Sequence, residues 1–172
     1  MSANKGVLEF LTVAAEFCAF VEKAEQISKR DFIEKSQKIL SLIYLKASLL
    51  KQETEIEGYC DQYVTEDDWN FVKDAITAKL GSHETFLEII EPDNYSNSET
   101  VSVSISECFA DMYQDLRDFI ERYKDGNDEA REIAIFECIL QFKMYWGARL
   151  LAVLTEFHSL LYASNSSIEH ED

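Results

Sequence analysis

The sequence predicts an all-α, single-domain helical bundle of about five main helices, with an acidic loop after the second helix. Its 172 residues are a length typical of one domain. Only five Gly and one Pro interrupt the chain, which is too few for the many turns of a β fold. Apolar residues make up 47% of the chain and recur mostly at helical spacing, as in helices that share a core.

The first two helices are expected at residues 5–25 and 29–51. The first helix carries one apolar stripe with charged residues opposite, the pattern of a helix with one buried face. The second helix carries two stripes, so that its second half is apolar nearly all round. Because such a helix is usually surrounded by others, we expect it at the centre of the bundle. The additional stripe consists of Leu42, Leu45 and Leu49.

The middle of the chain is expected to contain one well-marked helix between two irregular segments. Residues 52–64 are acidic and contain Gly, which predicts a loop. Thr65 is a suitable N-cap for the third helix, because three acidic residues follow it, and Gly81 is a suitable stop. Residues 86–90 fit either a short helix or an extended piece, and residues 92–99 have the composition of a loop.

The fourth helix is expected at residues 101–125. Residues 101–106 alternate between apolar and polar as a strand does. Helical spacing nevertheless continues beyond them, and we therefore favour a helix from residue 101 onwards. The apolar stripe that supports this choice is Ile105, Cys108, Phe109, Met112, Leu116, Phe119, Ile120 and Tyr123.

The fifth helix is expected at residues 128–163, capped by Asn127 or Asp128. Gly147 lies inside it and suits close helix packing or a kink. Residues 164–172 are polar and are expected to form a frayed tail. The predicted apolar stripe of this helix is Ile133, Phe136, Leu140, Met144, Gly147, Leu151, Leu154 and Leu161.

The formal net charge of −17 limits the classes of partner. The first fifty residues carry seven basic and six acidic groups, so the acidic excess lies in the rest of the chain. Nucleic acids and anionic membranes are bound through basic patches, and we expect neither as a partner. A basic protein partner fits this charge, although the charge also serves solubility alone.

The cysteines and the N-terminal segment predict a cytoplasmic protein. None of the four cysteines forms a C-x-x-C pair, so the signatures of zinc ribbons and thioredoxins are absent. Reduced thiols are typical of the cytosol. Glu9 and Glu16 interrupt the first apolar run, which argues against a signal peptide. No segment approaches 18 uncharged apolar residues, so no membrane span is expected.

No cofactor or metal site is expected from motifs. Phosphate-binding, dinucleotide-binding, nucleophile-elbow and EF-hand motifs are all absent from the sequence. Three scattered histidines argue against zinc hydrolases and di-iron carboxylate bundles. Acidic residues crowd one side of the fourth helix, where they form either a solvated face, with Asp118 paired to Arg122, or a site for a hard cation. These residues are Glu107, Asp111, Asp115 and Asp118.

A few ionisable side chains fall within or beside apolar stripes. Because a lone buried charge is costly, we expect at least one Lys–Asp pair between helices. Such groups either line a cleft that binds or transforms a small molecule, or form structural ion pairs with lysine stems that reach the surface. The candidate cluster consists of Lys46, Asp111, Asp115, Lys143 and His158.

Several stretches resemble a family of small bacterial proteins known as domain of unknown function 5063. They occur in the expected order along nearly the whole chain, with one departure at Lys51, where that family usually carries Pro. The resemblance implies an all-helical fold and a cytoplasmic bacterial protein, and it implies no particular activity. The stretches are FLTVAAEFC at 10–18, YLKASLL at 44–50, SISE at 104–107, ADMYQDL at 110–116 with DF at 118–119, and YWG at 145–147.

Two functional hypotheses follow from the sequence. The first is a non-enzymatic, acidic helical domain that binds another protein, since catalytic motifs are absent and residues 53–68 are strongly acidic. The alternative is an enzyme or small-ligand binder that uses the semi-buried Lys/Asp/His cluster. A shared cavity for the five side chains would favour the alternative.

Overall fold

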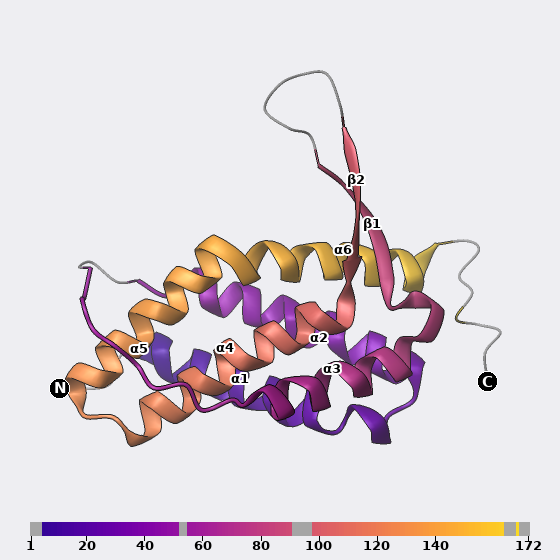
Figure 1. Cartoon of the computed structure of the whole chain (residues 1–172). Coiled ribbons are helices and arrows are strands. Elements are labelled where there is room, and N and C mark those ends of the chain that lie inside the picture. Colours follow the sequence, from indigo (N-terminus) through magenta and orange to yellow (C-terminus); the bar gives the residue numbers. More distant parts are fainter. Residues whose placement is uncertain (1–4, 52–54, 91–97, 164–167, 169–172) are drawn as a thin grey trace.

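Helices make up most of the structure, and one β-hairpin projects from them (Figure 1). This computed structural model describes residues 5–51, 55–90, 98–163 and 168. The predicted all-α class is confirmed, with a small two-stranded sheet added. The elements are α1 (Lys5–Glu22), η1 (Ala24–Gln26), α2 (Lys29–Ser48), α3 (Glu66–Leu80), η2 (Gly81–His83), β1 (Thr85–Ile90), β2 (Glu99–Ser104), α4 (Ile105–Asp125), α5 (Asp128–Gln141), η3 (Phe142–Trp146) and α6 (Gly147–Tyr162).

Helix α4 lies at the centre of the bundle. It packs against α1, α3, α5 and α6. Phe109 on α4 is fully buried, and its ring lies 6.0 Å from Phe17 on α1, 5.4 Å from Phe32 on α2 and 6.1 Å from Phe157 on α6. Aromatic contacts at these distances bury large apolar areas. Four helices thus meet around one phenylalanine of α4.

The prediction that α2 is the central helix is wrong. Helix α2 packs against α1 and α6, and its additional leucine stripe lies on the side that neither neighbour covers. Leu42, Leu45 and Leu49 are 43%, 53% and 59% exposed. Apolar side chains are not confined to the interior, so an all-round apolar pattern does not by itself place a helix at the centre.

The segment before α4 is a strand, contrary to the predicted helix from residue 101. Strand β2 pairs antiparallel with β1, and the register runs from Thr85 opposite Ser104 to Ile90 opposite Glu99. For residues 86–90 the extended alternative is therefore confirmed. Pairing with β1 gives the backbone of β2 hydrogen-bond partners that a sequence period cannot reveal. Most of the predicted loop at 92–99 lies outside the described residues.

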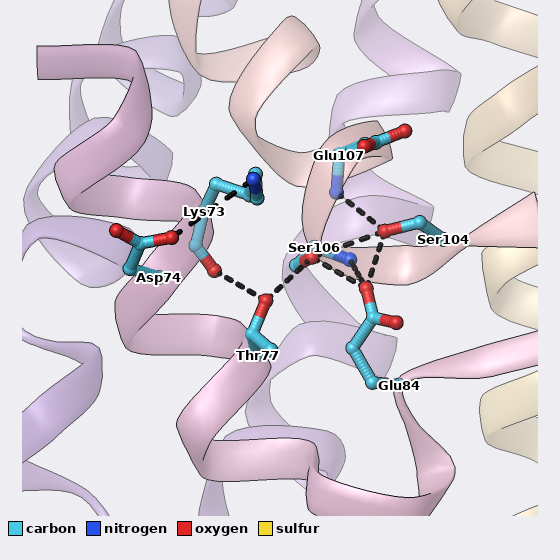
Figure 2. Close-up of polar contacts among 7 residues, drawn as sticks. All are labelled: Lys73, Asp74, Thr77, Glu84, Ser104, Ser106 and Glu107. Carbon is cyan, nitrogen blue, oxygen red and sulfur yellow. Dashed lines mark hydrogen bonds and ion pairs between the residues drawn. The ribbon is translucent and has the colours of Figure 1, made fainter. Parts of the chain in front are cut away.

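A polar cluster fixes the base of the hairpin to the bundle (Figure 2). The Glu84 carboxylate accepts hydrogen bonds from the hydroxyls of Ser104 and Ser106, and the Ser106 amide donates to it at 3.2 Å. Thr77 on α3 lies with its Oγ1 atom 2.9 Å from Ser106 Oγ, and the Ile105 amide donates to the Glu84 carbonyl at 2.8 Å. A carboxylate is favoured at the N-terminus of a helix, as here at α4. The hairpin is thus held between α3 and α4.

The predicted fifth helix is two α-helices joined by one wide π turn, η3. The extra residue in that turn changes which positions face the core after it. The predicted stripe is therefore only partly correct, because Leu140, Met144 and Leu151 are exposed. The positions buried instead, at and after the turn, are Trp146, Leu150, Val153 and Phe157.

Gly147 follows the π turn and has no room for a side chain. A Cβ atom there would lie 2.5 Å from the carbonyl oxygen of Phe142 and 2.8 Å from its ring atom Cε2. We expect Gly147→Ala to lower the free energy of unfolding by about 1–3 kcal/mol, because the backbone of η3 has to shift. Urea denaturation measures this change. The control is Ala148→Ser at an exposed position, which should change the free energy of unfolding by under about 0.5 kcal/mol. Equal stability of the Gly147→Ala and wild-type proteins would contradict this packing.

Predicted helix ends are confirmed at several positions. The Thr65 side chain accepts a hydrogen bond from the Asp68 amide as the N-cap of α3, Gly81 follows α3 with φ of 55°, and Asn127 caps α5. Of the predicted tail only Ile168 is described, and it is buried. None of the described helices has the length and apolar character needed to span a bilayer.

Candidate functional site

Two neighbouring hollows lie along α4, where the segment before α3 rests against it. One has a volume of about 250 Å³ and the other about 580 Å³, and both are lined by Gln62 and Gln114. We call them together the α4 trough. The first is lined by Tyr59, Cys60, Gln62, Gln114, Asp115, Asp118, Phe119, Arg122, Ala134, Glu137, Cys138 and Gln141, and the second by Gln62, Val64, Thr65, Glu66, Trp69, Asp111 and Gln114.

Asp118 ties the segment before α3 to α4. Only 4% of Asp118 is exposed, and its Oδ1 atom accepts hydrogen bonds from the amides of Tyr63 at 2.9 Å and Val64 at 2.8 Å. The predicted pairing with Arg122 is confirmed at 3.8 Å. The solvated-face alternative is wrong for Asp118, because an irregular segment covers it. The tie forms one wall of the trough.

Arg122 is the cation that lines the first hollow, and two of its three guanidinium nitrogens already donate hydrogen bonds. Its Nη1 atom donates to Glu137 Oε2 at 2.8 Å, and its Nε atom donates to the carbonyl oxygen of Asp61. With Asp118 nearby as well, one guanidinium is shared by two carboxylates and a carbonyl. Arg122 therefore compensates only part of the negative charge in this hollow.

Asp115 lines the same hollow, and among the described residues it has no hydrogen-bond or ion-pair partner. Burial, and after it the negative charges of Asp111 and Asp118, raise the pKa of Asp115 to about 7, while the positive charge of Arg122 opposes the change. This carboxyl group accordingly changes its charge near neutral pH. The trough becomes more negative as Asp115 ionises.

The two cysteines of the hollow are not activated. Burial raises the pKa of the Cys60 thiol, and the neighbouring Glu137 charge acts in the same direction. Burial likewise raises the pKa of Cys138, with Asp115 contributing. Thiols with raised pKa values stay protonated and are poor nucleophiles.

Asp111 joins three elements at the second hollow. Its Oδ1 atom accepts a hydrogen bond from Trp69 Nε1 on α3 at 2.9 Å, and its Oδ2 atom accepts one from the Tyr145 hydroxyl in η3 at 2.7 Å. Burial, and then the bond to Asp111, raise the pKa of Tyr145 to about 12. Both donors are neutral, so they hold the carboxylate in place without compensating its charge.

The five residues of the predicted cluster do not come together. Asp111 and Asp115 line the trough, whereas Lys46, Lys143 and His158 do not. Lys143 and His158 are both exposed, contrary to their predicted core-facing positions, because the π turn shifts the faces of this helix. The ring of His158 lies 4.8 Å from that of Tyr162.

Lys46 forms an interhelical ion pair, although not with the expected aspartate. Its Nζ atom donates to Glu9 Oε2 at 2.8 Å, which links α2 to α1. This hydrogen bond and the charge of Lys46 lower the pKa of Glu9. The Lys46 side chain is 26% exposed, so the pair lies at the edge of the core. This contact agrees with the alternative in which Lys46 forms a structural ion pair.

Some residues of the trough were not predicted as site residues from the sequence. Glu137 comes from α5, and Gln62 comes from an irregular segment whose position no helical period can give. Among the residues that were missed, Arg122 had a usable signal in the sequence, namely its i, i+4 spacing from Asp118. Across the described parts of the chain, no group of three or more His, Cys, Asp or Glu side chains is arranged to hold a metal ion.

Comparisons with known proteins support the fold. The model of the family described as "Domain of unknown function (DUF5063)" matches residues 2–163. The chain is also similar to the crystal structure of protein BF1032 from Bacteroides fragilis, with 34% sequence identity and a TM-score of 0.83. That similarity covers 95% of this chain and 96% of the other. No curated protein matches the chain.

Proposed function

The chain belongs to the DUF5063 family, and we propose that it is an acidic interaction domain whose α4 trough binds a lysine- or arginine-bearing segment of another protein. The observation that carries this proposal is Asp115, a carboxyl group in a hollow with no partner among the described residues. Its charged neighbours are Asp111, Asp118, Glu137 and Arg122, so carboxylates outnumber cations around it. A cation from a partner would supply the missing charge.

A lysine ammonium fits the chemistry of the first hollow. It carries three donors and no acceptor, so it can bond Asp115 and neighbouring oxygens together. Arg122 makes no hydrogen bond or ion pair with Asp115, and its Nη1 and Nε atoms already donate to Glu137 and to the Asp61 carbonyl. Charge-assisted hydrogen bonds of this kind are about twice as strong as neutral ones.

The shape of the trough suits an extended segment better than a single small molecule. Two hollows adjoin at Gln62 and Gln114, and carboxylates line both. Side-chain amides at the junction can donate to and accept from a peptide backbone. The alternative of a small-ligand site built on the predicted five-residue cluster is less well supported, since three of the five do not line the trough.

The test is binding of a fluorescein-labelled peptide with lysines at alternate positions, measured by fluorescence anisotropy at neutral pH. We expect Asp115→Asn to weaken binding about tenfold, since the ammonium loses its charged acceptor. The matched control is Asp74→Asn on α3, which removes the same charge from an exposed side chain. Equal weakening by the two variants, or equal binding of an alanine-substituted peptide, would show a response to net charge alone and contradict the proposal.

Binding is also expected to depend on pH through Asp115. Ionisation of Asp115, with its pKa of about 7, strengthens attraction for a cation, so affinity should rise as pH rises through neutrality. The bound cation should lower that pKa, and binding near pH 7 should therefore release protons. Titration calorimetry in two buffers of different ionisation enthalpy measures the release. Asp115→Asn should abolish it, and its persistence would assign the release to another group.

A further inference from the structure

A second surface, distinct from the α4 trough, is formed by α2 and α1. Leu42, Leu45 and Leu49 lie on one exposed side of α2, at the i, i+3, i+7 spacing by which one helix packs on another. Among the described elements, none covers them. A contiguous exposed apolar patch marks an interaction site more often than scattered apolar residues do.

A groove adjoins this stripe. It lies between α1 and α2, has a volume of about 270 Å³, and has Val13, Ile39 and Leu42 as its apolar lining. Its charged lining residues are Glu16 on α1 and Lys35 and Lys38 on α2. Leu42 belongs to both the groove and the stripe, so the two form one continuous apolar surface.

The charge beside this surface is the reverse of that of the whole protein. Residues 35–48 of α2 contain three lysines and no carboxylate, whereas the chain carries −17. Lys46 is paired with Glu9, but Lys35 and Lys38 are exposed and have no ion-pair partner within the described part of the chain. Within the groove lining these two lysines outnumber the single carboxylate, Glu16, and charges more than about 10 Å away are screened at physiological salt.

We propose that the groove and the leucine stripe bind an amphipathic helix of a partner protein, whose carboxylates face Lys35 and Lys38. The stripe runs along a helix axis, which suits an apolar helix face laid into a groove. The unpaired lysines select an acidic flank. A second copy of this chain would present two lysines and only one carboxylate, Glu16, on the same surface, so charge favours a different, acidic protein.

Two designed, fluorescein-labelled helices provide the test. Both carry leucines at the i, i+3, i+7 spacing, and their flanking residues are Glu in one and Lys in the other. We expect the Glu-flanked helix to bind at least about tenfold more tightly, as measured by fluorescence anisotropy. Leu45→Glu should weaken binding at least about tenfold, because it places an unpaired carboxylate on the stripe. The double variant Lys35→Glu, Lys38→Glu should reverse the preference between the two helices.

Leu87→Glu serves as the matched control, because Leu87 is an exposed leucine on the hairpin. It should leave binding unchanged, and circular dichroism melting should show every variant folded. Failure of the Glu-flanked helix to bind, equal binding of both helices, or equal effects of Leu45→Glu and Leu87→Glu would overturn the proposal. Sedimentation of the protein alone supplies a further arm. A dimer that Leu45→Glu dissociates would assign this surface to a second copy and also overturn it.

Discussion

Asp118→Ala is expected to lower the free energy of unfolding by about 3 kcal/mol, because it removes a buried acceptor from two amides. The amides of Tyr63 and Val64 have the Asp118 Oδ1 atom as their acceptor, and alanine offers no replacement. Arg122 also loses one of its two carboxylates. Urea denaturation at neutral pH measures the total, and amide hydrogen exchange at Tyr63 and Val64 measures the local effect.

Two further variants test whether the loss of stability comes from the hydrogen bonds of Asp118. Asp118→Asn retains an oxygen that can accept from the amides, so its cost should be smaller than that of alanine. Asp74→Ala removes an exposed carboxylate and should cost under about 0.5 kcal/mol. If Asp118→Ala leaves the exchange of both amides unchanged, Asp118 does not hold the segment.

Asp115→Asn should act in the opposite direction and stabilise the protein at and above neutral pH. The pKa of Asp115 is raised from 3.8 to about 7, so folding disfavours its ionised form. Below about pH 4 the carboxyl is protonated in both the folded and the unfolded states and imposes no penalty. Between about pH 4 and pH 7 the unfolded state loses its proton first, and stability falls as pH rises.

The asparagine variant should escape this penalty. Its unfolding free energy should equal that of wild type near pH 4 and exceed it by about 1–3 kcal/mol above pH 7, allowing for partial solvent screening. Urea denaturation of both proteins across this pH range gives the difference directly. A difference that does not change with pH would assign the effect to packing rather than to ionisation.

These two aspartates lie within one turn of α4 and have opposite effects on stability. Asp118 stabilises the fold, whereas ionised Asp115 destabilises it and is not hydrogen-bonded by any described residue. A residue that lowers stability yet strengthens binding is typical of a functional site. Asp115→Asn should therefore give a more stable protein that binds the lysine peptide less well.

Local signals predicted the parts of the fold that depend on neighbours in sequence. Thr65 caps α3 and Asn127 caps α5 through side-chain contacts three residues away. Strand β2 could not be predicted in this way, because its partner β1 is a separate segment. The prediction that α2 lies at the centre of the bundle failed for a different reason. Its leucine stripe is apolar, but nothing in the described chain covers it.

The candidate site was only partly predictable for the same reason. Asp111 and Asp115 border the core on the helical wheel of α4, and both line the trough. Asp118 was assigned to solvent because the chain that covers it is irregular and has no period. Lys143 and His158 were assigned to the core because their positions were counted through η3 at α-helical spacing.

The number of residues in the π turn η3 determines which face of α6 is buried. Buried positions at Cys138, Trp146 and Leu150 stay on one side only because the π turn, Phe142–Trp146, accommodates an additional residue. Deleting one residue there would leave an ordinary helix but rotate everything beyond it by about 100° relative to α5. Phe157 would then turn away from Phe109 at the centre of the bundle. A gap between residues 138 and 150 in an alignment of relatives would thus signal a change in which face of α6 meets the core.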